Sequence, residues 1–115
     1  MTGRRFILTG LFGITLLCPV AASHADETVS AVPSSLWASP RSAEIVAAEP
    51  AIAGVVQAWH QQPRRVIVVR HAPGESAELR ASELRGWLVA LGVPSDAIDV
   101  RISEEAGDRL RLLVR

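Results

Sequence analysis

The sequence predicts an α+β fold, a two-layer sandwich with the element order α-β-α-β-β, in which a small mixed sheet carries its helices on one face. Two patterns support this prediction. Apolar residues recur at spacings of three and four over 39–61 and 76–92, as they do in amphipathic helices. The segments 66–69, 98–102 and 110–115 are either continuously apolar or alternate between apolar and polar residues, as strands do.

The first helical segment is expected to begin with Ser39 as its N-cap and Pro40 in the first turn, where the missing N–H costs nothing. Pro50 interrupts the segment, so a kink or a restart is expected there, because proline removes one backbone hydrogen bond and clashes with the preceding turn. An apolar stripe assigns part of this segment to the core, and its members are Ile45, Ala48, Ile52, Val55, Val56 and Trp59.

The later elements follow from turn residues and β-branched runs. Residues 66–69 are all β-branched, which favours a strand covered on both faces. The turn after it leads to the helix 76–92, for which Ser76 is the expected cap and Gly92 the terminator. The first two strands should run parallel through this crossover helix. The last two are separated by the polar loop 103–108 and are expected to form a hairpin.

The chain divides into three parts. Residues 1–25 have the form of a secretory signal peptide, with an apolar stretch after two arginines and small residues before a cleavage point at Ala25. The stretch is too short for a comfortable membrane span, so a cleaved signal that leaves no stable membrane anchor is expected. Residues 26–38 mix Ser, Pro and acidic residues without a period, which predicts a flexible linker. Residues 39–115 remain as one small domain.

Composition excludes several classes of function. The 12 basic residues are all Arg and are balanced by 12 acidic residues. Removal of Arg4 and Arg5 with the signal leaves a slightly acidic chain, which is not expected to bind nucleic acid. Cys18 would be removed as well, and thiolate chemistry with it. His60 and His71 lie on different elements without a cluster of further ligands, so no metal or other cofactor is expected.

Residues 65–76, RVIVVRHAPGES, resemble the beginning of a histidine phosphatase, in which a histidine at the end of a strand accepts the phosphoryl group. His71 would be that nucleophile. Such an enzyme also needs a second histidine and further arginines downstream, but no histidine follows position 71. The remaining chain is too short to build the site, so a phosphatase is kept only as an alternative and a protein without catalytic activity is expected.

Residues 80–100, RASELRGWLVALGVPSDAIDV, resemble the centre of the OmpA-like peptidoglycan-binding domain. The matching features are the pair Arg80-Ala81 early in a helix, the stretch WLVALGVP, and Ile98 at the start of the next strand. The strand that ends at His71 also resembles the one that precedes a Gly-His-Thr-Asp type turn in that family. The resemblance covers about half of the chain beyond the signal peptide and implies a periplasmic protein of the cell envelope.

In the OmpA-like family, the arginine of this pair and an aspartate of the turn hold the diaminopimelate of the peptidoglycan peptide. The resemblance therefore makes Arg80 and His71 the candidate ligand-binding residues. Pro73 stands where the aspartate is expected, so the carboxylate half of the clamp is missing. The alternative for Arg80 is a local ion pair with Glu75 or Glu83.

The sequence is therefore interpreted as a non-catalytic, exported binding module of the cell envelope. The expected partner is another envelope protein, and peptidoglycan is the second candidate. A further hypothesis is a structural subunit that docks through an exposed strand of the C-terminal hairpin. Trp87 lies at the edge of the apolar stripe of its helix, which makes it a candidate for covering a partner.

Overall fold

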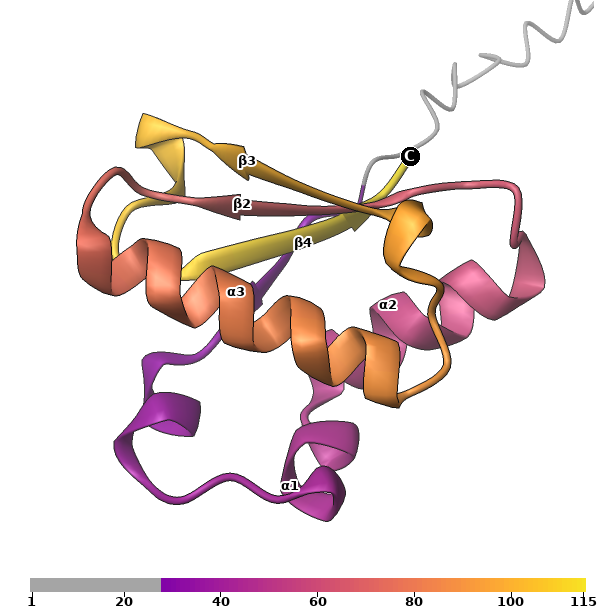
Figure 1. Cartoon of the computed structure of the whole chain (residues 1–115), viewed down its shortest axis with the longest axis horizontal. Helices are drawn as coiled ribbons and strands as arrows, with labels where there is room; N and C mark the ends of the chain where they lie inside the picture. Colours follow the sequence, from indigo (N-terminus) through magenta and orange to yellow (C-terminus); the bar gives the residue numbers. More distant parts are fainter. Residues whose placement is uncertain (1–27) are drawn as a thin grey trace, which may run out of the picture.

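The computed structural model describes residues 28–115, so the predicted signal peptide lies outside the described residues. Helices and strands alternate along most of the chain (Figure 1). In chain order the elements are β1 (Ser30–Val32), the 3₁₀ helix η1 (Ser34–Ala38), α1 (Ala43–Ala48), α2 (Pro50–Gln61), β2 (Ile67–His71), α3 (Glu75–Ala90), η2 (Ser95–Ala97), β3 (Ile98–Ile102), η3 (Glu104–Ala106) and β4 (Leu110–Val114).

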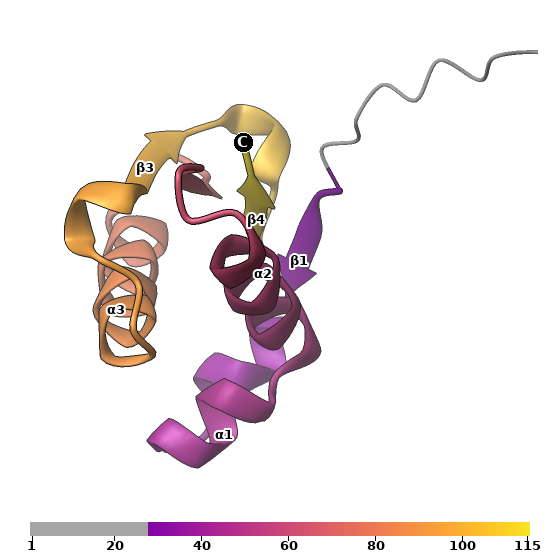
Figure 2. The same ribbon diagram turned by 90° about the vertical axis from the view of Figure 1, so that its right-hand side faces the viewer.

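The strands form one mixed sheet in the order β1-β4-β2-β3. β2 and β3 are connected by the crossover helix α3 and run parallel to each other. β4 runs antiparallel to both of its neighbours, β1 and β2. α2 and α3 lie on the same face of this sheet (Figure 2). The predicted class, an α+β fold with helices on one face of a small mixed sheet, is confirmed, and so is the parallel pairing.

β4 lies in the middle of the sheet, which makes the predicted C-terminal hairpin wrong. Its consecutive residues Leu112 and Leu113 point to opposite faces and are both fully buried. A strand buried on both faces needs hydrogen-bonding partners on both edges, and β1 and β2 supply them. Within the described residues β3 pairs with β2 and not with β4. The connection between β3 and β4 passes around the end of β2, where the N–H of Ser103 donates to the carbonyl of His71 at 2.8 Å.

The segment predicted as a flexible linker, 26–38, contributes a strand and a 3₁₀ helix to the domain. β1 pairs with β4 in the register Ser30 to Leu112, and Val32 is 0% exposed. Leu36 of η1 is buried in the same core. A strand of three residues is too short to show a period of two, and the Ser and Pro residues around it are typical of loops. This is why the sequence pattern did not reveal it.

The helix boundaries differ in part from those expected. The hydroxyl of Ser42, and not that of Ser39, caps α1 by accepting a hydrogen bond from the N–H of Ile45. The restart at Pro50 is confirmed, because Glu49 has an extended backbone and caps α2 with its side chain. Because the helix breaks at Glu49, the residues of α1 that face the core differ from those of the predicted stripe. Ile45 is 49% exposed, and Val46 is buried in its place.

The core lies between the sheet and the helices. Trp59 belongs to it, as predicted, and its indole Nε1 donates a hydrogen bond to the carbonyl of Arg65 at 2.9 Å. β2 supplies two further core residues, Ile67 and Val69, and α3 supplies a stripe of three. The members of that stripe are Ala81, Leu84 and Leu88.

The substitution Val32→Ala tests whether β1 belongs to the folded domain. It removes two buried methyl groups, so we expect the free energy of unfolding to fall by about 2 kcal/mol. Urea denaturation followed by circular dichroism measures this change. Val29→Ala is the matched control, because Val29 is 40% exposed and its truncation should cost far less. Equal stability of Val32→Ala and the original protein would mean that this segment does not contribute to the core.

Candidate functional site

A pocket of about 310 Å³ lies at the end of the sheet where β2 leads into α3. Segments distant in sequence meet there: η1 contributes Trp37, the start of α3 with its preceding turn contributes 72–77 and Arg80, and the connection before β4 contributes 107–110. They meet because β2 and β3 run parallel and end together, while the antiparallel β4 begins at that same end. We call this cavity the α3 pocket.

The first turn of α3 forms part of the pocket wall. Gly74 precedes the helix with a φ of 122°, a conformation that is strained for residues with a side chain. No side chain caps the helix, so the predicted cap by Ser76 is wrong. The first backbone N–H groups of a helix have no partner within the helix. In α3 they are therefore available to an anion, which the helix dipole also favours.

Arg80 lines the α3 pocket from the second turn of the helix and is half-buried. Within residues 28–115, no hydrogen bond or ion pair engages its guanidinium group. The alternative of a local pair with Glu75 or Glu83 is not realised, because the carboxylate of Glu83 is held by Arg41 instead. The free guanidinium of Arg80 is therefore available to a ligand.

Charges of both signs surround the pocket. The acidic residues Glu75 and Asp108 belong to its lining, and Arg109 is a second basic residue there beside Arg80. No ion pair joins any of these four residues within the described part of the chain. The pocket thus offers separate anionic and cationic groups, an arrangement suited to a ligand that itself carries both charges.

His71, the other predicted site residue, is not part of this pocket. Its side chain is only 4% exposed, and its ring Nδ1 lies 2.8 Å from the carbonyl oxygen of Ala72. It pairs with Ile102 of β3 at the end of the parallel ladder. His71 and Arg80 therefore do not line the same pocket. Arg80 lines the α3 pocket, whereas the imidazole of His71 is buried at the end of β2.

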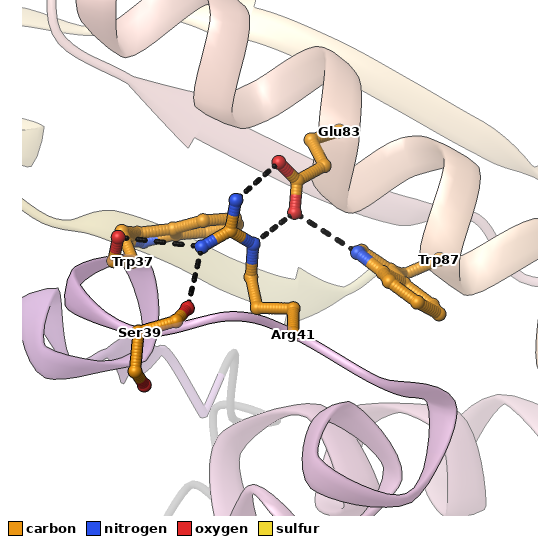
Figure 3. A network of polar contacts seen from close by, with 5 residues as sticks. All are labelled: Trp37, Ser39, Arg41, Glu83 and Trp87. Carbon is orange, nitrogen blue, oxygen red and sulfur yellow. Dashed lines mark hydrogen bonds and ion pairs between the residues drawn. The ribbon is translucent and has the colours of Figure 1, made fainter.

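A polar network that the sequence did not predict lies beside the pocket, between the η1 segment and α3 (Figure 3). The guanidinium of Arg41 binds the carboxylate of Glu83 with two nitrogens: Nε donates to Oε2, and Nη2 donates to Oε1 at 3.0 Å. Its remaining nitrogen, Nη1, donates to the carbonyl oxygens of Trp37 and Ser39, at 3.3 and 2.9 Å. We call this set of contacts the Arg41 network.

Two tryptophans complete the Arg41 network. The indole Nε1 of Trp87, a half-buried residue, donates to Oε2 of Glu83 at 3.0 Å. The guanidinium carbon of Arg41 lies 5.3 Å from the ring centroid of Trp37, within the range of a cation–π contact. Because Trp37 also lines the α3 pocket, the network fixes one wall of that pocket.

The network sets the protonation behaviour of Glu83. Hydrogen bonds from Arg41, supported by the bond from Trp87 and by the positive charge of Arg41, lower the pKa of this carboxyl below its ordinary value. Partial burial acts in the opposite direction but is the weaker influence overall. Glu83 is therefore ionised at neutral pH. In the sequence Glu83 is considered only as a local partner of Arg80, whereas its partner in the structure, Arg41, lies 42 residues earlier.

Comparison with protein-family models, with curated proteins and with solved structures finds no match for this chain. Among residues 28–115 no helix is long and apolar enough to cross a membrane. The same residues contain no group of three or more His, Cys, Asp or Glu side chains that could hold a metal ion. The fold and the α3 pocket thus define a small α+β domain with a surface pocket lined by charged and apolar residues.

Replacing Glu83 by Gln tests the Arg41 network. The side chains of Arg41 and Glu83 are 25% and 37% exposed, so solvent screens their attraction and we expect a loss of about 1 kcal/mol in unfolding free energy at pH 7. The lowered pKa means that this stabilisation is complete above the ordinary glutamate pKa of about 4.3 and is lost as the pH falls through the folded-state pKa.

Urea unfolding at pH 7 and at successively lower pH measures both effects. The stability difference between the original protein and Glu83→Gln should shrink as the pH falls through the folded-state pKa of Glu83. Glu104→Gln is the control, because Glu104 is exposed and its side chain has no hydrogen bond or ion pair within the described chain. A difference that persisted unchanged into strong acid would contradict an electrostatic origin.

Proposed function

We propose that this protein is a non-catalytic, exported binding module of the cell envelope, and that its α3 pocket binds a ligand carrying both a carboxylate and an ammonium group. The stem peptide of peptidoglycan, with its charged amino acids, is a ligand of this kind. The proposal rests on the guanidinium of Arg80, which has no hydrogen bond or ion pair within residues 28–115, in a pocket whose lining also includes the acidic residue Asp108.

The pocket offers two kinds of group to the carboxylate of such a ligand. Arg80 can donate two parallel hydrogen bonds to it, a geometry that a guanidinium matches well. The uncapped N-terminus of α3 adds backbone N–H groups beside Arg80. A carboxylate bound here would gain a charge-assisted hydrogen bond without breaking any hydrogen bond or ion pair of the Arg80 guanidinium within the described chain.

The ammonium group of the ligand would be received by a carboxylate of the pocket. Pro73 removes the aspartate that the resemblance to OmpA-like domains led us to expect in the turn. Asp108, on the connection before β4, lines the same pocket and supplies a carboxylate from a different segment. Asp108 can thus take the place of the missing turn aspartate, which supports peptidoglycan as the ligand more strongly than the sequence pattern alone does.

The rival hypotheses have less support. The C-terminal hairpin is not formed, and β4 is paired on both edges within the described residues, so docking through β4 has lost its basis. Of the two strands predicted for that hairpin, β3 alone has an open edge in the described sheet. The proposed role of His71 as a phosphoryl acceptor needs an accessible imidazole, whereas this ring is buried and does not line the pocket. A protein partner that presents a charged chain end to the α3 pocket remains the second candidate, on the same observation.

Co-sedimentation with purified sacculi tests the proposal. The full chain is expressed, and the protein is purified with whatever N-terminus results from processing in the cell. We expect binding that weakens at least tenfold in Arg80→Ala and in Asp108→Asn, because each change removes one half of a charge-assisted contact. Circular dichroism confirms that both variants are folded.

Arg64→Ala is the matched control, because Arg64 is exposed and lies outside the pocket lining. It should bind as the original protein does. If the original protein fails to sediment with sacculi, peptidoglycan is excluded as the ligand. If Arg64→Ala weakens binding as much as Arg80→Ala, the attraction is one of general charge and the assignment of the α3 pocket is wrong.

A further inference from the structure

The outer edge of β3 is unpaired within residues 28–115, because β3 is the last strand of the sheet beside β2. The direction of its backbone groups follows from the contact in which the N–H of Ser103 donates to His71 of β2. Alternate residues of a strand direct their N–H and C=O groups to opposite edges. Asp99 and Arg101 therefore face β2 with their backbone groups, and the alternating residues Ile98, Val100 and Ile102 direct theirs outward.

This free edge lacks two of the features that usually prevent strands from pairing. Edge strands are commonly very short or interrupted by proline. β1, at the other edge of the sheet, has only three residues and is followed directly by Pro33. β3 has five residues and no proline, and it exposes apolar side chains: Val100 is 36% and Ile102 is 68% exposed. β3 thus has an open edge of sufficient length for another strand to pair with it.

The charged residues of β3 lie on the helix-free face of the sheet. Arg70 of β2 pairs in register with Arg101 of β3 and with Arg111 of β4, which makes a row of arginines across neighbouring strands. Like charges directly opposite one another destabilise a sheet. Asp99 offsets part of this repulsion, because its Oδ2 lies 2.7 Å from Nε of Arg101. Further negative charge beside this row would stabilise it.

We propose that two copies of this chain associate edge to edge through β3, antiparallel, with Val100 opposite Val100 of the second copy on a twofold axis. In this register Val100 pairs with itself and Ile98 pairs with Ile102, and all of these residues direct their backbone groups outward, so their N–H and C=O groups satisfy one another. The apolar side chains of both copies also lie on the same face of the joined sheet.

The charges select this one register. With Val100 on the axis, Asp99 lies opposite Arg101 of the second copy, in a non-hydrogen-bonded pair where side chains approach most closely. Shifting the partner by two residues in one direction would put Asp99 opposite itself, and shifting it in the other direction would put Arg101 opposite itself. The sequence of β3 is therefore self-complementary, which favours a second copy over an unrelated strand.

Sedimentation velocity over a range of concentrations tests the charge pairing, with protein purified after expression of the full chain. We expect a monomer–dimer equilibrium that Arg101→Asp weakens by about tenfold or more, because an attractive pair becomes repulsive on both sides of the axis. The matched variant Asp99→Arg/Arg101→Asp exchanges the two charges and should restore the dimer. A folded exchange variant that stays monomeric while the original protein dimerises would overturn the proposed register.

Val100→Pro tests the backbone contacts. The backbone N–H of Val100 points away from β2, so a proline at this position removes no hydrogen bond of the β2–β3 ladder. The variant should therefore stay folded, which circular dichroism checks. The dimer should be lost, whereas Val100→Thr, which keeps the N–H and the β-branched shape, should retain it. A dimer that survives in Val100→Pro, or an original protein that stays monomeric up to ~1 mM, would overturn the proposal.

Discussion

β4 makes backbone hydrogen bonds along both of its edges, to β1 on one side and to β2 on the other. Its two central leucines are buried on opposite faces, so the strand contributes to the helix-covered core and also supports the helix-free face. The position of β4 also determines the α3 pocket, because the connection that carries Asp108 has to pass the end of β2 to reach it. Fold and candidate site thus depend on the same pairing.

The Arg41 network adds a second link between distant parts of the chain. It joins the segment after η1 to the middle of α3 through a bidentate contact between the guanidinium of Arg41 and the carboxylate of Glu83. Such a contact fixes orientation as well as distance, because both groups are planar. Trp37 is held in this way at the border between the network and the α3 pocket, so contacts within the chain support one wall of the candidate site.

The sequence was a good guide to the elements with a strong period and a poor guide to those without one. α3 and β2 were expected nearly at their observed positions, because an apolar stripe along a helix and a run of β-branched residues are local signals. β1 and the central position of β4 were missed, because strand order depends on pairing between residues far apart in the chain. A resemblance singles out Arg80 as a candidate but does not single out Asp108, since only the topology brings these two residues to the same pocket.

The sheet order has a consequence for how the domain reaches its native state. Within the described residues, β1 has β4 as its only strand partner, although these strands lie at opposite ends of that part of the chain. Closing so long a loop has an entropic cost that only the completed ladder and core can offset. β2 and β3 can pair through α3 while the rest of the chain is unfolded, but β1 has no strand to join until residues 110–114 take their place beside β2. Completion of the sheet therefore depends on a contact between the first and the last of the described strands.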